Sequence, residues 1–262
     1  MCRSPGIPHD LLARSGREGS VDEVTLCEAL SKLINFSLIT PVGSGDHTAY
    51  EIYSLVHLSI EAFLSVKGEM ETAIKRTAKL LVEILPTGDS ENWPVWRVYL
   101  PHASAFVRIV NVDREEIATI YYYMSWYFWR LGCYSEAECA AQRSVDIRKG
   151  ILGLNHKDTL SSQHILALTY SYLGWWKEAE VLVVQAMEVR RRVLGQEHPD
   201  TLTSMNNLAW TYKSQGRIDD AIALMAQAAA LYTRVLGEDH PYTTGSIDDL
   251  AEWRDEVGAE SP

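Results

Sequence analysis

The chain has 262 residues, of which 47% are hydrophobic and 23% charged, a composition that excludes global disorder and allows a sizeable core without disulfides or metals. Its 24 basic and 35 acidic residues give a formal net charge of −11, which disfavours binding to nucleic acid or to an anionic membrane. The four cysteines form no C-x-x-C pair, and neither a secretory signal nor a run of roughly 18 apolar residues is present, so we expect a cytoplasmic protein.

Residues 1–20 are rich in proline and glycine, and we expect a flexible N-terminus there. The next segment, 21–66, begins with a helical apolar stripe over 24–34. Strand candidates at 36–39 and 50–53 then flank a Gly-Ser-Gly-Asp turn, and a second helix follows them. This order predicts a small winged-helix-like unit. Its hairpin is poor in lysine and arginine, which disfavours DNA binding by the wing.

Residues 67–112 are predicted to form a helical linker. One helix covers 68–84 and ends before Pro86, and another runs through 99–103. The linker connects the hairpin unit to the second half of the chain.

Residues 113–257 contain an internal repeat with a period of 42 residues. The recurring residues are Gly132, Gly174 and Gly216; Ala137, Ala179 and Ala221; His156, His198 and His240; and the Leu-Gly pairs beginning at Leu152, Leu194 and Leu236. Several independent columns that share one spacing indicate a repeat architecture.

Each period predicts two helices. In one copy the first helix runs from Pro199, which suits a first turn, to about Gln215, and Gly216 suits a left-handed stop. The second helix runs from about Asp219, placed to cap its N-terminus, to Leu236. A single helix pair cannot cover its own apolar face, so neighbouring pairs must stack. The sequence therefore predicts a mainly α solenoid of three and a half repeats.

The last half repeat, residues 241–257, is predicted to be a C-terminal capping helix, followed by a tail over 258–262. A terminal helix with no partner beyond it needs a polar outer face. The acidic residues that supply this face are Asp248, Asp249, Glu252, Asp255 and Glu256.

Over about residues 115–257 these columns resemble the tetratricopeptide repeat. The 42-residue period and the L-G-x-x-H-P-D-T connector resemble the kinesin-light-chain version of that repeat. The resemblance implies an α-solenoid that binds other proteins and has no catalytic activity.

The first half, over about residues 8–110, resembles fungal proteins that join an NB-ARC-type nucleotide switch to kinesin-light-chain-like repeats. The residues that carry this resemblance are Ala29–Leu33, Phe36–Ile39, Tyr50–Leu64, Glu91–Trp93 and Tyr99–Ala103. In that family the segment is the winged-helix end of the switch. The resemblance implies a role as the sensor or regulatory end of a STAND-type NTPase.

Two departures from that family concern the nucleotide. The sequence has no P-loop of the form G-x-x-x-x-G-K-S/T, whose lysine and backbone N–H groups hold phosphates. Tyr53 stands where the family's Met-His-Asp signature has its histidine, and a phenol cannot copy the charge behaviour of an imidazole. We therefore expect no ATP binding, no cofactor and no enzymatic activity. The alternative is a fragment of an ATP-dependent signalling switch whose nucleotide-binding core is missing from this chain.

The three repeated histidines, His156, His198 and His240, invite a metal interpretation. Zinc needs its nitrogen ligands about 2 Å away, whereas packed helices lie about 8–10 Å apart. Residues one repeat apart therefore cannot share an ion, and we expect each histidine to fix its connector through hydrogen bonds. The sequence also lacks the Gly-x-Ser-x-Gly motif of a serine hydrolase.

The resemblance implies that the first helix of each repeat lines a concave groove that binds a peptide or helix of a protein partner. The implied groove residues are Tyr122, Trp126, Trp129, Arg130, His164, Ser171, Tyr172, Asn206, Trp210, Lys213, Ser214, Asp248, Glu252 and Asp255. Tyr122, Trp126 and Trp129 form one stripe, and two interpretations of it stay open, a docking surface for a neighbouring domain or a ligand surface. The acidic last helix favours a basic segment as partner, and no small-molecule substrate is expected.

Overall fold

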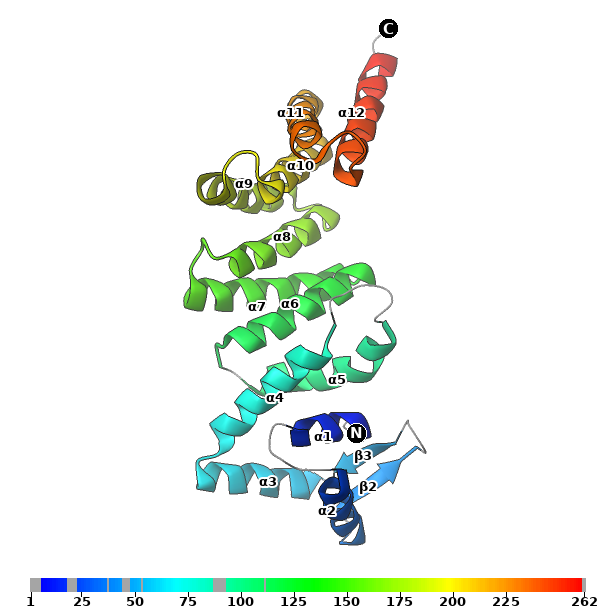
Figure 1. Ribbon diagram of the computed structural model, residues 1–262, viewed down its shortest axis with the longest axis vertical. Coiled ribbons are helices and arrows are strands. Elements are labelled where there is room, and N and C mark those ends of the chain that lie inside the picture. The colour runs from blue at the N-terminus through cyan, green and yellow to red at the C-terminus, as the bar shows by residue number, and fades with distance from the viewer. Residues whose placement is uncertain are drawn as a thin grey trace. The chain divides into compact units, whose positions relative to one another are not determined.

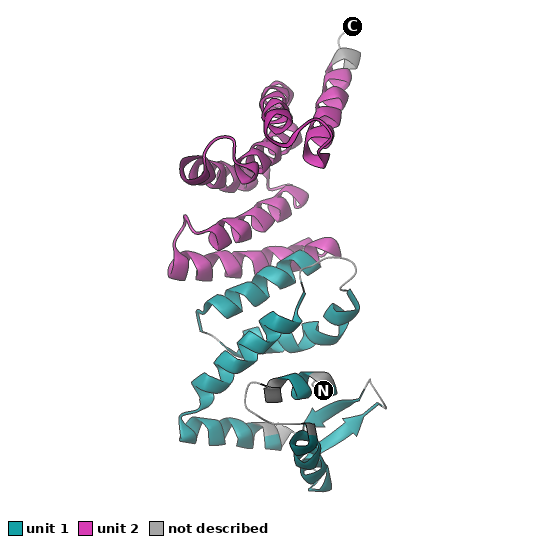
Figure 2. Cartoon of the chain, in the orientation of Figure 1, with its two compact units in different colours: residues 1–127 teal, residues 128–262 magenta. Residues whose placement is uncertain are grey.

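The computed structural model describes residues 6–17, 23–36, 38–43, 48–52, 54–86, 93–110 and 112–260. The chain divides into two units, residues 1–127 and 128–262, shown in teal and magenta in Figure 2. None of the helices in these described ranges combines the length and hydrophobicity that crossing a membrane requires.

Unit 1 opens with a small three-stranded sheet and its helices. The order along the chain is β1 (Ile7–Pro8), α1 (His9–Arg17), α2 (Glu23–Asn35), β2 (Ile39–Val42), β3 (Ala49–Ile52) and α3 (Ser54–Lys67). The sheet order is β1-β3-β2 with antiparallel pairing throughout. Leu30 of α2 packs with Ile39 and Tyr50 of the sheet to form a small core. A helix packed on an antiparallel hairpin is the arrangement that the sequence predicts for this winged-helix-like unit.

The N-terminal segment differs from the sequence expectation of a flexible stretch over 1–20. Residues 7–17 form β1 and α1, because β1 pairs with β3 and Leu12 packs against the sheet core. The first hairpin strand also differs, since β2 begins at Ile39 and not at Phe36. Ile39 is buried in the core and Phe36 is exposed, so burial of Ile39 sets the position of the strand.

Unit 1 continues through α4 (Met70–Ile84), α5 (Trp93–Ile109) and the first part of α6 (Glu115–Arg130). The buried faces of α4 and α5 include Leu81 and Trp96. The indole of Trp96 stacks on Tyr127 of α6, with ring centroids 4.9 Å apart. This aromatic pair places α5 against the start of the repeats.

Unit 2 is a stack of antiparallel helix pairs. Its helices are α7 (Tyr134–Leu152), α8 (Lys157–Tyr172), α9 (Trp176–Leu194), α10 (Pro199–Ser214), α11 (Ile218–Leu236) and α12 (Pro241–Glu260). Each helix contacts the next one along the chain, as Figure 1 shows from green through red. The structure is mainly α-helical, and the predicted solenoid is confirmed.

Small buried residues allow the helices of a pair to approach closely. Ala137, Ala179 and Ala221 are fully buried at equivalent positions of α7, α9 and α11. Larger side chains fill the space beside small ones, such as Met225 beside Ala221 and Leu208 beside Ala167. This alternation of sizes is what close packing of neighbouring helices requires.

The turns between helices use glycine as the sequence predicts, but one predicted cap is wrong. Gly216 has φ of +77°, a left-handed conformation that glycine adopts without strain, and Gly237 ends α11 with φ of +91°. The N-cap of α11 is Arg217 and not Asp219, because the helix begins at Ile218 directly after the glycine turn. Asp219 lies in the first turn, where its charge favours the positive end of the helix dipole.

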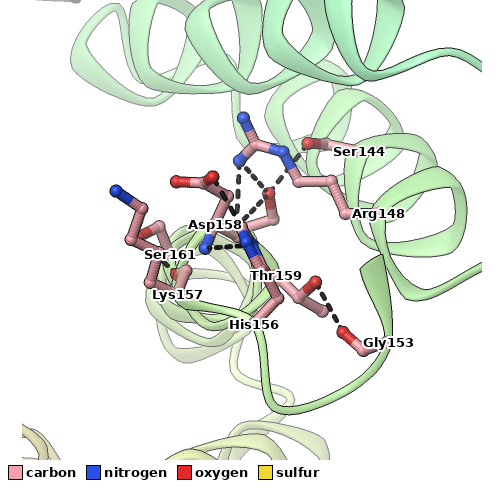
Figure 3. A network of polar contacts seen from close by, with 9 residues as sticks. Ser144, Arg148, Gly153, His156, Lys157, Asp158, Thr159 and Ser161 are labelled. Carbon is pink, nitrogen blue, oxygen red and sulfur yellow. Dashed lines mark hydrogen bonds and ion pairs between the residues drawn. The ribbon is translucent and has the colours of Figure 1, made fainter. Parts of the chain in front are cut away.

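The connector between repeats is held by short-range hydrogen bonds (Figure 3). Nδ1 of His156 accepts from the backbone N–H of Asp158 at 3.3 Å, and Thr159 donates to the carbonyl of Gly153 at 2.8 Å. The next connector repeats the pattern, with His198 accepting from the N–H of Asp200 at 3.2 Å. The predicted structural role of these histidines is confirmed. Across the described ranges no three His, Cys, Asp or Glu side chains gather as a metal site would require.

An arginine near the end of the second helix joins each of the first two junctions between repeats. Nη1 of Arg148 on α7 donates to the carbonyl of Asp158 at 2.9 Å and to the hydroxyl of Ser162 at 2.8 Å. Arg190 takes the same position one repeat later and donates to Ser204 at 2.6 Å. These bonds join the second helix of one repeat to the first helix of the next.

We predict that His198→Ala lowers the free energy of unfolding by about 1 kcal/mol, because it removes the N-cap acceptor of α10. The imidazole is partly exposed, so little packing is lost with it. Urea unfolding followed by circular dichroism measures the change. His198→Asn is the matched control, since asparagine is a good N-cap, and a loss equal to that of alanine would contradict the capping role.

Candidate functional site

A concave pocket of about 380 Å³ lies between the first helices of two successive repeats, α8 and α10, with α9 behind them. We call it the groove pocket. Its lining residues are His164, Ala167, Leu168, Ser171, Tyr172, Val183, Asn206, Asn207, Trp210, Thr211 and Ser214. Six of the fourteen groove residues implied by the sequence therefore lie together around one hollow.

The repeat period explains this convergence. His164 and Asn206 are 42 residues apart and occupy the same position of α8 and α10, as do Tyr172 and Ser214. Because these helices are equivalent elements of neighbouring repeats, equivalent positions face the same side of the stack. The pocket lining combines hydroxyl, amide and aromatic groups and contains no charged side chain. Such a lining suits hydrogen bonding to a peptide backbone together with apolar contact.

His164 is the ionisable residue of the pocket wall. Its Nδ1 lies 3.2 Å from the amide nitrogen of Asn207, which donates to it. Burial and the positive charge of Arg190 lower the pKa of His164 to about 4. The imidazole is therefore neutral near pH 7 and keeps Nδ1 as an acceptor.

Several predicted groove side chains hold α12 against α10. Asn206 donates to the hydroxyl of Ser246 at 2.9 Å. The indole N–H of Trp210 donates to the carboxylate of Asp249 at 3.2 Å, and burial raises the pKa of that carboxyl. Lys213 forms an ion pair with Glu256 at 3.0 Å. These contacts fix one end of the groove and leave part of the Trp210 ring exposed.

Asp248 and Glu252 are exposed on α12, as is Asp255. They give the last helix an acidic outer surface next to the acidic Asp249 and Glu256. A basic partner segment would meet a favourable potential there.

The first-repeat residues fall on both sides of the boundary between the units. In unit 2, the edge of the Trp129 ring meets Tyr172 with ring centroids 5.3 Å apart. The guanidinium carbon of Arg130 lies 5.8 Å from the Trp129 ring centre, and Arg130 is exposed. Tyr122 and Trp126 belong to unit 1, and both are half-buried.

Part of the pocket wall was not predicted from the sequence. Asn207 follows a predicted groove residue and bonds to His164, and Thr211 lies one turn further and bonds back to the Asn207 carbonyl. Val183 comes from α9 and reaches the pocket beside the small side chain of Ala167. The signal that could have indicated Asn207 is its polar side chain next to the apolar core residue Leu208.

A family model matches the part of the chain that holds the groove pocket. Residues 158–234 match the model of the tetratricopeptide repeat. These residues thus form tetratricopeptide repeats within the helical solenoid.

One fungal protein and two crystal structures are also similar to this chain. A protein of the fungus Hyaloscypha variabilis, described as a nucleotide-binding leucine-rich repeat (NLR)-like protein, is 34% identical over 162 residues, which are 61% of this chain and 16% of that protein. The chain spans about a sixth of the length of this relative. Two crystal structures of Podosopora anserina kinesin light chain TPR-like repeats, one of them a variant, are each 22% identical. Each covers 77% of this chain and 85% of its own, with TM-scores of 0.52 and 0.53, and this likeness shows the fold.

Proposed function

We propose that the chain is a non-catalytic protein–protein interaction scaffold that binds a peptide or helix of a protein partner in the groove of its tetratricopeptide repeats. The observation that supports this most is the groove pocket, where exposed rings of Tyr172 and Trp210 flank the amides of Asn206 and Asn207. The rings supply contact area, and the amides supply hydrogen bonds to a backbone. We propose no cofactor, no small-molecule substrate, no nucleic acid and no membrane among its ligands, and a cytoplasmic location.

The proposed binding surface also includes predicted groove residues that do not line the pocket. At one side Trp129 contacts Tyr172 and Arg130 lies near the Trp129 ring, and at the other side α12 carries Asp248 and Glu252. A partner segment that follows the repeats would carry a basic residue at the α12 end, because that helix is acidic. Tyr122 and Trp126 on α6 in unit 1 are proposed as further partner-binding residues, as the resemblance to the repeat family implies.

A peptide array tests the groove. We expect Ser214→Arg and Trp210→Ala to weaken binding of captured synthetic peptides by about tenfold or more, because both change the pocket wall. Gln185→Arg is the matched control, since it adds the same charge on an exposed part of α9 that does not line the pocket. If captured peptides bind all these variants as they bind the original chain, the groove is not the binding site.

The alternative is that the chain belongs to an ATP-dependent signalling switch of the STAND type. The NLR-like description of the Hyaloscypha variabilis relative favours this setting, in which the repeats would be the sensor or regulatory end. The chain itself lacks the phosphate-binding P-loop sequence. Titration with ATP and ADP tests the purely scaffolding role, because measurable nucleotide binding by this chain would overturn it.

A further inference from the structure

The turn between α8 and α9 exposes three large aromatic side chains within five residues. Tyr172 is 57% exposed, Trp175 48% and Trp176 41%. Their rings are held in place, since Tyr172 stacks on Tyr134 with centroids 4.9 Å apart and the Trp176 indole donates to the carbonyl of Ser171 at 3.3 Å. An ordered, exposed aromatic patch of this kind is typical of an interaction surface.

In the next repeat, the position equivalent to Trp175 is occupied by an arginine. Arg217 lies 42 residues after Trp175, and its guanidinium carbon is 4.0 Å from the centre of the Tyr212 ring. One guanidinium nitrogen is 3.1 Å from Glu180 of the preceding repeat, and the other is 2.7 Å from Asp220. A guanidinium thus sits on a tyrosine ring between two carboxylates from successive repeats.

In the preceding repeat, a tyrosine and two acidic residues stand at the equivalent positions, but a tryptophan replaces the arginine. Tyr170, Glu138 and Glu178 occupy the positions of Tyr212, Glu180 and Asp220, and Trp175 occupies that of Arg217. The Trp175 ring contacts the Tyr170 ring at an interplanar angle of 43°, with centroids 5.4 Å apart. Glu178 and Trp175 line one hollow. Burial raises the pKa of Tyr170, and the negative charges of Glu138, Glu178 and Asp146 raise it further.

We infer that the surface formed by Tyr170, Trp175, Glu138 and Glu178 binds an arginine side chain of a partner peptide. The exposed indole offers a face on which a planar guanidinium stacks, and the carboxylates accept its N–H groups. Lysine is a poorer fit, because its ammonium is compact and strongly hydrated and cannot stack as a plane.

This arginine site is separate from the groove pocket, since none of its residues lines that pocket. The inference therefore does not depend on the proposed groove function. The net charge of −11 on the whole chain favours a basic ligand, and Glu178 and Glu180 line one hollow with Trp175, together with the basic Lys177 and Arg217.

Fluorescence anisotropy with the complete chain tests the site. The probes are two labelled peptides of glycine and serine that carry either arginines or lysines at the same positions. We expect the arginine peptide to bind more tightly than the lysine peptide. Trp175→Arg should weaken its binding by about tenfold or more, because the chain's own guanidinium would then occupy the site as Arg217 does.

The reciprocal change adds a gain of binding. Arg217→Trp frees Glu180 and Asp220 and places an indole over Tyr212, so we expect a second equivalent of arginine peptide to bind. Both substituted side chains are about half exposed, and unfolding midpoints check that each variant is folded. If Trp175→Arg does not fold, the double change Glu138→Gln with Glu178→Gln tests the same acceptors and should weaken binding by a similar factor.

Controls separate this site from other effects of charge. Gln185→Arg adds one positive charge elsewhere on α9, and Ser214→Arg blocks the groove pocket. Both should reduce binding of the arginine peptide far less than Trp175→Arg does. The inference is overturned if the arginine peptide does not bind, if the lysine peptide binds equally well, or if Gln185→Arg and Trp175→Arg weaken binding to the same extent.

Discussion

Replacing Trp253 with alanine is expected to lower the free energy of unfolding by about 3–5 kcal/mol, the range for removing a fully buried tryptophan. Trp253 has no exposed surface and lies on α12. Its ring meets Trp210 edge to face with centroids 4.9 Å apart, and the Lys213 ammonium lies 5.0 Å from the ring centre. The same side chain packs with Ala209 and Met225, so its removal takes away the main apolar contact of the last helix.

The loss should be local, because each repeat of a solenoid contacts only its neighbours. Urea unfolding should show an early transition for α12, and hydrogen exchange should be faster there than in α8 and α9. Trp253→Phe is the control, since it keeps an aromatic face under Lys213 and removes a buried indole N–H that has no acceptor among the described residues. An alanine variant that unfolds at the same midpoint as the original chain would show that α12 does not depend on this residue.

Acid should destabilise the chain through His164 by roughly 2–3 kcal/mol as the pH falls from about 6.5 to about 4. Burial and Arg190 lower the pKa of His164 from 6.5 to about 4 in the folded protein. In this range the unfolded chain binds a proton that the folded chain excludes, so lower pH favours unfolding. The full shift corresponds to about 3.4 kcal/mol, and the figure given is smaller because about 0.4 kcal/mol of it falls beyond each end of this pH range.

His164→Asn isolates this contribution. Asn206 is the equivalent residue of the next repeat, so the substitution copies a side chain that this position already accommodates. We expect the variant to lose less stability than the original chain between pH 6.5 and 4, as measured by urea unfolding at several pH values. Equal losses in the two proteins would mean that His164 titrates in the folded state as it does in the unfolded chain.

The repeat period made most of the groove pocket predictable. Once the period of 42 was known, positions such as His164 and Asn206 had to face the same side of the stack. Val183 could not be predicted in this way, because it reaches the pocket from the second helix, beside Ala167. That contact depends on side-chain packing and leaves no regular pattern in the sequence.

In the first half of the chain, the predicted and observed elements differ because strands far apart in the sequence pair with each other. Strand β1 has two residues and pairs with β3 more than forty residues later in the chain. A segment this short has no periodicity of its own, and its proline and glycine neighbours are typical of loose segments. The cap of α11 was mispredicted for another reason, since the glycine turn at Gly216 fixes the helix start before Asp219 can act as a cap.

The polar bonds between successive repeats are not all of one kind. Arg148 and Arg190 bridge the first two junctions, whereas the equivalent residue of α11 is Tyr232, whose hydroxyl bonds to Thr203 within its own repeat. The last junction is bridged by the amide of Asn206 to Ser246, by the indole of Trp210 to Asp249, and by the partly exposed ion pair of Lys213 with Glu256. Charge-assisted hydrogen bonds of a buried group such as Arg148 are stronger than an exposed ion pair, which contributes about 0–1 kcal/mol. Under a pulling force applied to its ends, this stack is therefore expected to unravel from the C-terminal repeat inward, so that tension would expose the far end of the groove first.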